Sequence, residues 1–286
     1  MKPERAIGEL TGQDVVDLRR LAGGDTAAAF VARLADGQEV FAKSSPGMPG
    51  AAEAEAAGLR WLAEPGAVPV PEVRGGDSEW LVIEHVPESA PSQRAAEELG
   101  AGLARLHAAG APAFGAAPPG GPADAWIGLA PMRNEPVEDW PTFYADHRVA
   151  PYARRARDEG ALDSATAQLL DQVCGELDRI VPEEPPARLH GDLWSGNVHW
   201  SGGRAWLIDP AAHGGHRETD LAMLHLFGCP HLDRVIAAYQ EVAPLAEGWR
   251  ERIGLHQLFP LLVHTVLFGG GYASQVARAA RSALRA

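Results

Sequence analysis

The chain has 286 residues, of which 46% are hydrophobic and 22% are charged, a composition that is ordinary for a globular protein with a substantial buried core. Its formal net charge of −13 argues against nucleic acid or an anionic membrane surface as the main partner, because both are polyanions. The two cysteines form no CxxC or metal-ligand pattern, and the first residues lack the apolar run of a signal peptide, so we expect a cytoplasmic protein without a membrane segment.

Residues 1–85 are predicted to form strands with one helix among them. Residues 15–45 hold three strand-like runs, joined first by a glycine loop and then by a turn at Asp36-Gly37. Asp-Gly between apolar runs is a strong hairpin signal, because the turn needs positive φ angles. A short helix is expected at residues 51–64, and a buried strand at 79–86 leads out of this unit.

From residue 87 the pattern becomes mainly helical. The Pro- and Gly-rich residues 110–128 predict a surface loop. Helices are expected at 92–110, 141–158, 163–180 and through most of the chain after Glu218, with short strands around 187–200 and 204–208. A strand-rich first part followed by a helix-rich second part predicts an α+β protein of two lobes, with the boundary between residues 85 and 86.

A group of short polar residues interrupts the apolar stretch RLHGDLWSGNVHW at residues 188–200. Asp192 is followed by Asn197, and Asp209 comes twelve positions later at the end of the apolar run AWLIDP. An Asp-x4-Asn loop and a short hairpin that ends in Asp are the layout of a kinase catalytic loop and its metal-binding segment. Carboxylate and amide oxygens are hard ligands that suit Mg²⁺. Taken singly, each residue has an ordinary alternative as a turn former.

The first lobe supplies the other parts of a nucleotide site. Lys43 ends the strand VFAK, where a kinase places the lysine that holds the α- and β-phosphates. Glu55 on the following helix is spaced to pair with that lysine, although Glu53 competes with it. Gly23 and Gly24, helped by Thr26, are expected to let backbone amides approach the phosphates.

The adenine ring of ATP is expected between the lobes, at residues Ile83–Val86. The main chain of Glu84 and Val86, on either side of His85, would offer it a carbonyl and an amide. We therefore interpret residues 1–85 as a nucleotide-binding lobe and residues 86–286 as a catalytic and acceptor-binding lobe.

The stretches HGDLWSGN and LIDPAAHGGHRETDLAMLHLFG resemble the fructosamine kinases, or ketosamine-3-kinases, which are relatives of the aminoglycoside and choline kinases within the protein-kinase-like fold. The resemblance implies transfer of the ATP γ-phosphoryl group to the 3-hydroxyl of a ketosamine (a fructosamine or a ribulosamine), a deglycation repair reaction. It implies that Asp192 is the general base, that Asn197 and Asp209 hold Mg²⁺, and that Lys43 with Glu55 positions ATP. The Ala212-His213-Gly214 run departs from the aromatic residues that relatives often carry there.

Further residues are expected beside this centre. Trp194 is either a stacking platform for the sugar or a core tryptophan. His216, Arg217 and Glu218 are expected near the acceptor, although Arg217 and Glu218 would equally form a structural ion pair. Asp220 is expected to anchor the catalytic loop, whereas His107 and His190 are expected to be structural histidines.

Other functions compete with this one. An aminoglycoside or other amino-alcohol phosphotransferase of the same fold is the nearest alternative, and a catalytically silent binding module would keep the fold alone. A metal-dependent hydrolase is a more distant alternative, with ligands drawn from His190, Asp192, His199, Asp209, His213 and His216. The sequence leaves open the natural acceptor and the oligomeric state.

Overall fold

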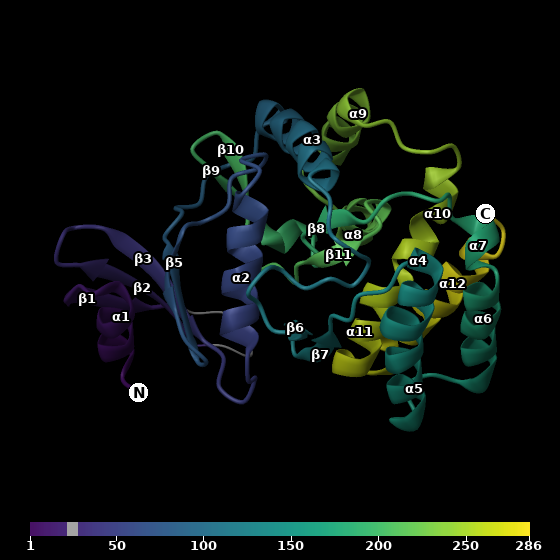
Figure 1. Cartoon of the computed structure of the whole chain (residues 1–286), viewed down its shortest axis with the longest axis horizontal. Coiled ribbons are helices and arrows are strands. Elements are labelled where there is room, and N and C mark those ends of the chain that lie inside the picture. Colours follow the sequence, from purple (N-terminus) through teal and green to yellow (C-terminus); the bar gives the residue numbers. More distant parts are fainter. Residues whose placement is uncertain (22–27) are drawn as a thin grey trace.

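The computed structural model describes residues 1–21 and 28–286. Its N-terminal part contains a five-stranded antiparallel sheet in the order β1-β2-β3-β5-β4; Figure 1 labels four of these strands, β1, β2, β3 and β5. The strands are β1 (Val15–Arg20), β2 (Ala28–Leu34), β3 (Glu39–Ser44), β4 (Val73–Gly76) and β5 (Trp80–Glu84). The predicted Asp36-Gly37 turn joins β2 to β3, with Gly37 at φ 87°, a conformation that glycine adopts without strain.

The sheet is covered by a helix on each face. Alternate residues of a strand point to opposite faces, and β5 shows this alternation clearly. Trp80 and Val82 join the apolar cluster beneath α1 (Pro3–Thr11), whereas Leu81 and Ile83 join the cluster beneath α2 (Ala51–Ala63). The all-apolar sequence of β5 is therefore that of a strand buried on both faces.

Two elements of this part differ from the sequence prediction. The expectation of a single helix among the strands is wrong, because α1 precedes the sheet and buries Ala6 and Ile7 against it. With nine residues and a proline at its start, α1 is shorter than the helices that periodicity identifies most readily. The strand β4 also lies in residues for which the sequence predicted no strand.

The remainder of the chain is mainly helical (Figure 1). Its helices are α3 (Gln93–Ala108), α4 (Trp140–Phe143), the π-helix η1 (Tyr144–Val149), α5 (Ala150–Asp158), α6 (Ser164–Gly175), α7 (Leu177–Ile180), α8 (Glu218–Phe227), α9 (Leu232–Val242), α10 (Trp249–His256), α11 (Leu258–Phe268) and α12 (Ala273–Ala283), with 3₁₀ turns η2 (Ser195–Asn197) and η3 (Gly270–Tyr272). The strands form three two-stranded pairs, which are β6 (Asp124–Ile127) with β7 (Ala130–Arg133), β8 (Ala187–Leu189) with β11 (His213–Gly215), and β9 (Val198–Ser201) with β10 (Arg204–Leu207). This combination confirms the predicted α+β class.

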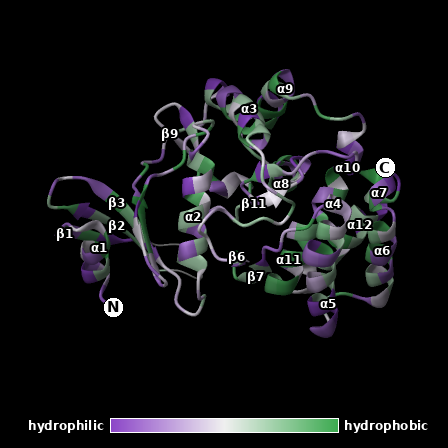
Figure 2. Cartoon of the chain, viewed as in Figure 1, coloured by the Kyte–Doolittle hydropathy of each residue, from purple (hydrophilic) through white to green (hydrophobic). Residues whose placement is uncertain are grey.

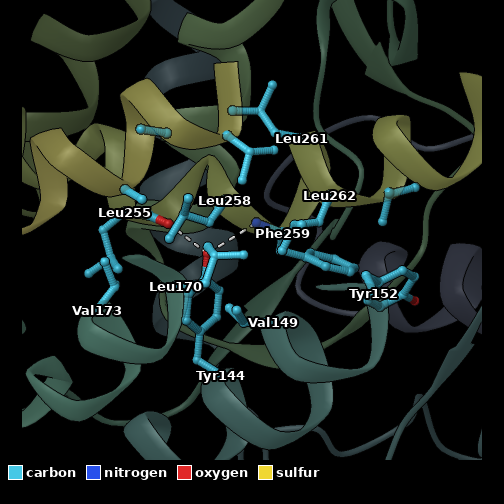
Figure 3. Close-up of a cluster of buried hydrophobic side chains, with 14 of the residues drawn as sticks. Tyr144, Val149, Tyr152, Leu170, Val173, Leu255, Leu258, Phe259, Leu261 and Leu262 are labelled. Carbon is cyan, nitrogen blue, oxygen red and sulfur yellow. Dashed lines mark hydrogen bonds between the residues drawn. The ribbon is translucent and has the colours of Figure 1, made fainter. Parts of the chain in front are cut away.

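The largest apolar cluster surrounds α11, and Figure 3 shows part of it. The buried Tyr144 hydroxyl donates a hydrogen bond to the carbonyl of Leu255 at 2.6 Å and accepts one from the amide of Phe259 at 3.3 Å. Both bonds satisfy a polar group that would be costly to bury alone. They fix the joint between α10 and α11, so α11 is held firmly where one of its faces borders the site described below.

The helical part also corrects the sequence prediction. Residues 110–128 were expected to be loop, but the hairpin β6–β7 begins at Asp124. The expected helix at 141–158 is interrupted by the π-helix η1, and the one at 163–180 is split into α6 and α7.

Figure 2 shows hydrophobic residues concentrated on α11 and on the central strands of the sheet. Within residues 1–21 and 28–286, no helix combines the length and the apolar character that crossing a membrane requires.

Candidate active site

The loop between β8 and β9 is fixed by a buried carboxylate. The backbone amides of His190 and Gly191 donate to Asp220 at 2.8 and 2.9 Å. Gly191 has φ 82°, and a Cβ there would lie 2.1 Å from the carbonyl oxygen of Ala211, so this position needs glycine. The prediction that Asp220 anchors the loop is confirmed.

The two histidines predicted to be structural are also confirmed as such. Buried His107 lies 2.9 Å from the Tyr239 hydroxyl and 3.3 Å from Asp220. Nε2 of His190 lies 2.9 Å from the carbonyl of Ile208, and its Nδ1 accepts from the amide of Asp192. His190 therefore joins the loop to the strand that leads to Asp209.

Asp192 and Asn197 lie together in this loop. The Asn197 side-chain amide donates to the backbone oxygen of Asp192 at 2.8 Å, to its carboxylate at 3.1 Å, and to the backbone oxygen of Asp209 at 3.4 Å. Burial raises the pKa of Asp192 to about 7, against the opposing hydrogen bond from Asn197 and with the support of the nearby negative charges of Asp209 and Asp220. Asp192 is thus a carboxylate with the basicity of a general base near neutral pH.

Lys43 on β3 joins two carboxylates that are distant in sequence. Its Nζ lies 2.6 Å from Glu55 on α2 and 2.8 Å from Asp209, whereas Glu53 is exposed. The structure therefore selects Glu55 as the partner of Lys43. Burial opposes the charge on Lys43, but the two carboxylates outweigh it and raise its pKa above the ordinary value. Lys43 in turn lowers the pKa of Asp209, again against the effect of burial.

Asp209 adopts an uncommon backbone conformation, with φ 51°. Non-glycine residues with positive φ are infrequent and often mark functional positions. This turn follows β10 and directs the Asp209 carboxylate toward Lys43 on β3.

These side chains border one cavity of about 340 Å³. The residues that border it include Lys43, Glu55, Asp192, Asn197 and Asp209. The hairpin β6–β7, the helix α11 and neighbouring segments supply the rest of its wall, which includes Met48, Trp126, Ile127, Asn134, Met223, Val263, His264, Leu267 and Phe268. The cavity wall therefore combines a few charged and polar side chains with many apolar ones, as in many small-molecule sites.

Sequence reasoning missed that apolar wall. The hairpin β6–β7 was hidden in a Pro- and Gly-rich stretch, and the apolar run of α11 has the composition of a core helix. One feature of the sequence pointed to a surface role for the end of α11: Phe268 ends the apolar run directly before three glycines. In the structure Phe268 is 65% exposed.

Trp194 also borders the cavity and is 38% exposed, so it is not an enclosed core tryptophan. Its ring packs edge-on against Phe227, with centroids 5.9 Å apart. The indole ring also lies over Gly196, where an added Cβ would lie 2.3 Å from it. The Trp194-Ser195-Gly196 segment thus folds so that the indole of Trp194 covers Gly196.

Three residues expected near the acceptor lie elsewhere. His216 and Glu218 are buried, and Glu218 accepts two hydrogen bonds from Arg252, at 2.6 and 2.9 Å. Arg217 forms two 2.7 Å hydrogen bonds with Glu184. None of the three is among the described residues that border the cavity, because Arg217 and Glu218 pair with Glu184 and Arg252 instead of with each other, and His216 is buried. This corrects the expectation.

The residues expected to hold adenine lie at and just beyond the end of β5. The backbone amide of Glu84 donates to the carbonyl of Glu72, and the side chain of His85 lies 3.1 Å from that of Glu39. Nε2 of His199 lies 2.8 Å from the carbonyl of Val86. The predicted phosphate-loop residues Gly23, Gly24 and Thr26 lie outside the described residues.

The ligand set of the alternative hydrolase is not assembled. Three of its histidines each lie about 2.8–2.9 Å from a backbone carbonyl, namely His190, His199 and His213. In the described part of the chain, the histidine and carboxylate side chains that converge are His216, Glu218 and His256, and both oxygens of that glutamate are already held by Arg252.

Comparison with known proteins gives a consistent result. A model of the family described as fructosamine kinase matches residues 2–286. The probable ketoamine kinase YniA of Escherichia coli is 33% identical over 93% of this chain and 92% of its own length. The chloroplastic protein-ribulosamine 3-kinase of Arabidopsis thaliana is 33% identical over 84% of this chain and 74% of its own. The crystal structure of a candidate fructosamine-3-kinase from Thermobifida fusca superimposes with a TM-score of 0.94, at 49% identity, and covers 100% of this chain and 99% of the other.

Proposed function

Because this chain belongs to the fructosamine kinase family, we propose that it transfers the γ-phosphoryl group of ATP to the 3-hydroxyl of a ketosamine, a fructosamine or a ribulosamine. The observation that carries the proposal is the position of Lys43. It joins Glu55 and Asp209 on the wall of the cavity that Asp192 also borders. A cation fixed next to a candidate base suits phosphoryl transfer, in which positioning and charge stabilisation dominate.

Asp192 is the proposed general base. As the substrate 3-oxygen attacks the γ-phosphorus, its proton passes to the Asp192 carboxylate, the bond from phosphorus to the bridging oxygen breaks, and ADP leaves. The raised pKa of about 7 makes the carboxylate a better proton acceptor than an ordinary aspartate, while it remains largely ionised in mildly alkaline solution. Lys43 holds the phosphates, and Glu55 keeps Lys43 in place.

Asn197 and Asp209 are the residues that would hold Mg²⁺. The Asn197 amide nitrogen is engaged by Asp192, so its oxygen remains to act as a ligand, and one Asp209 oxygen faces Lys43 while the other is left. Two hard oxygens fit this ion. When bound, Mg²⁺ offsets the negative charge of the phosphates.

The remaining parts of the ATP site are proposed from the sequence. Gly23, Gly24 and Thr26 would approach the phosphates, and the backbone around His85, from Glu84 to Val86, would contact adenine. On this assignment residues 1–85 bind the nucleotide, residues 86–286 bind the acceptor, and the reaction belongs to deglycation repair in the cytoplasm.

The test is ATP consumption with fructosyl-lysine, ribulosyl-lysine, an aminoglycoside and choline as acceptors, with phosphorus NMR to locate the new phosphoester. We expect turnover of one or both ketosamines and a phosphate on O3. Turnover of the aminoglycoside or choline alone would favour the alternative amino-alcohol phosphotransferase. Hydrolysis of a substrate without ATP would favour the metal-dependent hydrolase.

A further inference from the structure

Five aromatic side chains pack against one another on and beside the cavity wall, and we call them the aromatic rim. They are Trp194, Phe227, His264, Phe268 and Tyr272. The Phe227 ring lies between those of Trp194 and His264, with centroid distances of 5.9 and 5.0 Å. The His264 ring lies 5.5 Å from Phe268 and 5.1 Å from Tyr272. The rim is therefore a continuous aromatic surface built from the catalytic loop, α8, α11 and η3.

This surface is unusually exposed for apolar side chains. Trp194 is 38% exposed, Phe227 39% and Phe268 65%. Among the described residues these are three of the seven large hydrophobic side chains that are exposed, and they belong to one contiguous group. Contiguous exposed apolar surface commonly marks a binding site. Trp194, His264 and Phe268 also border the cavity that contains Asp192, so the rim extends the active site.

The rim is also free of formal charge. Nδ1 of His264 lies 2.7 Å from the carbonyl of Pro260, which can only accept, so Nδ1 carries the hydrogen. Burial lowers the pKa of His264, and the ring is neutral at pH 7. Among the described residues that border the cavity, the lysine and the carboxylates are Lys43, Glu55, Asp192 and Asp209, and none of them belongs to the rim.

We propose that the aromatic rim binds the substituent on the amine nitrogen of the ketosamine, and that it selects substrates in which this substituent is apolar or aromatic. The inference rests on the proposed function and adds the class of acceptor. In a ketosamine the amine is bonded to C1, two carbons from the 3-hydroxyl that must reach Asp192. The amine substituent then extends from the sugar toward the rim, where stacking and burial of apolar surface favour it. A charged or strongly polar substituent would lose water there without gaining a partner.

The test compares two adducts of fructose, one with benzylamine and one with glycine. The wild type is expected to show a KM for the benzylamine adduct about tenfold lower than for the glycine adduct, the effect of one stacked and partly buried ring. Phe268→Ser should raise the first KM about fivefold to tenfold and leave the second within about twofold. Val16→Ser is the matched control, because Val16 is 60% exposed on the distant strand β1, and it should change neither KM.

The outcomes separate this inference from the proposed function. If the wild type phosphorylates both adducts with equal KM, or if Phe268→Ser raises both values alike, the rim has no such role while the kinase activity stands. If neither fructose adduct is phosphorylated, and the ribulose adducts of the same two amines are not phosphorylated either, the proposed function fails. Calorimetric binding of the benzylamine adduct without ATP then decides: binding that Phe268→Ser abolishes supports the rim as an apolar site, and absence of binding to the wild type overturns it.

Discussion

The side chain of Asn197 donates hydrogen bonds to both the backbone oxygen and the carboxylate of Asp192, at 2.8 and 3.1 Å. One amide therefore fixes the position of the carboxylate and, as a donor to its charged form, also lowers its pKa relative to burial alone. The oxygen of the same amide is left to act as a ligand, and we propose that it binds Mg²⁺. Asn197 thus couples the proposed base to the proposed metal site.

This coupling gives a prediction for Asn197→Ala. The loss of the hydrogen bond raises the pKa of Asp192 above its value of about 7, so more of the base is protonated at neutral pH. We expect the rise of kcat/KM with pH to move to higher pH and kcat to fall about 100-fold. The measurement is a pH profile of kcat/KM from about pH 5 to pH 9. A profile with an unshifted acidic limb would show that Asn197 does not act on Asp192.

Asp192→Asn should abolish turnover, leave ATP binding largely intact and stabilise the fold. Since the folded state raises the pKa of Asp192 from 3.8 to about 7, it disfavours the ionised form. This penalty is absent below the unfolded pKa, grows as the pH rises toward 7, and is complete above it. We therefore expect the variant to have a larger free energy of unfolding than the wild type at pH 8, by up to about 4 kcal/mol, and no advantage at pH 4. Urea unfolding at the two pH values measures this, and an equal effect at both would contradict a raised pKa.

The pair Glu55 and Glu53 provides a matched comparison on one helix. Glu55 lies 2.6 Å from Lys43 and both side chains are largely buried, whereas Glu53 is exposed. Glu55→Gln should raise the KM for ATP and lower kcat, each about tenfold, because Lys43 is less well positioned. Glu53→Gln should change each value by less than about twofold. Steady-state kinetics with ATP varied distinguishes them, and equal effects would remove Glu55 from the proposed site.

The two glutamates also show how much of the site could be predicted from the sequence. The spacing from Lys43 restricted the partner to two glutamates, but both lie on one helix within half a turn of each other, and helical phase did not separate them. Burial separates them, because the sheet and the helical part enclose only one side of α2. The Asp192, Asn197 and Asp209 spacing was equally informative, since a loop and a short hairpin leave few other ways to connect them.

The positions of other residues could not be predicted from their spacing in the sequence. His216, Arg217 and Glu218 are polar residues close in sequence to Asp209, and that proximity suggested the acceptor site. Their orientation depends on the start of α8 and on partners far along the chain, such as Arg252. The hairpin β6–β7 has strands of only four residues each, too short for a clear alternation of apolar and polar positions.

Gly196→Ala should weaken binding of the acceptor without affecting ATP. A methyl group at this position would lie 2.3 Å from the indole of Trp194, so the ring must move away from its place on the cavity wall. We expect the KM for a ketosamine to rise about tenfold and the KM for ATP to stay within about twofold. Gly175→Ala is the control, because a Cβ there meets no atom within 4 Å. Unchanged acceptor KM in Gly196→Ala would mean that the position of Trp194 does not matter to the substrate.

Glu218→Gln tests whether the residues at the start of α8 are structural. Glu218 pairs with Arg252 at 2.6 Å, with side-chain exposures of 3% and 6%. Removal of the glutamate charge leaves a buried guanidinium without its counter-ion, so we expect the free energy of unfolding to fall by about 3 kcal/mol. The KM for the ketosamine should stay within about twofold of the wild type in the fraction that folds.

Glu159→Gln is the control. It breaks an exposed pair with Arg155 and should lower the free energy of unfolding by less than about 0.5 kcal/mol. Denaturant unfolding and steady-state kinetics on the same preparations give both quantities. A large rise in acceptor KM with normal stability would instead return Glu218 to the acceptor site, against its position in the ion pair.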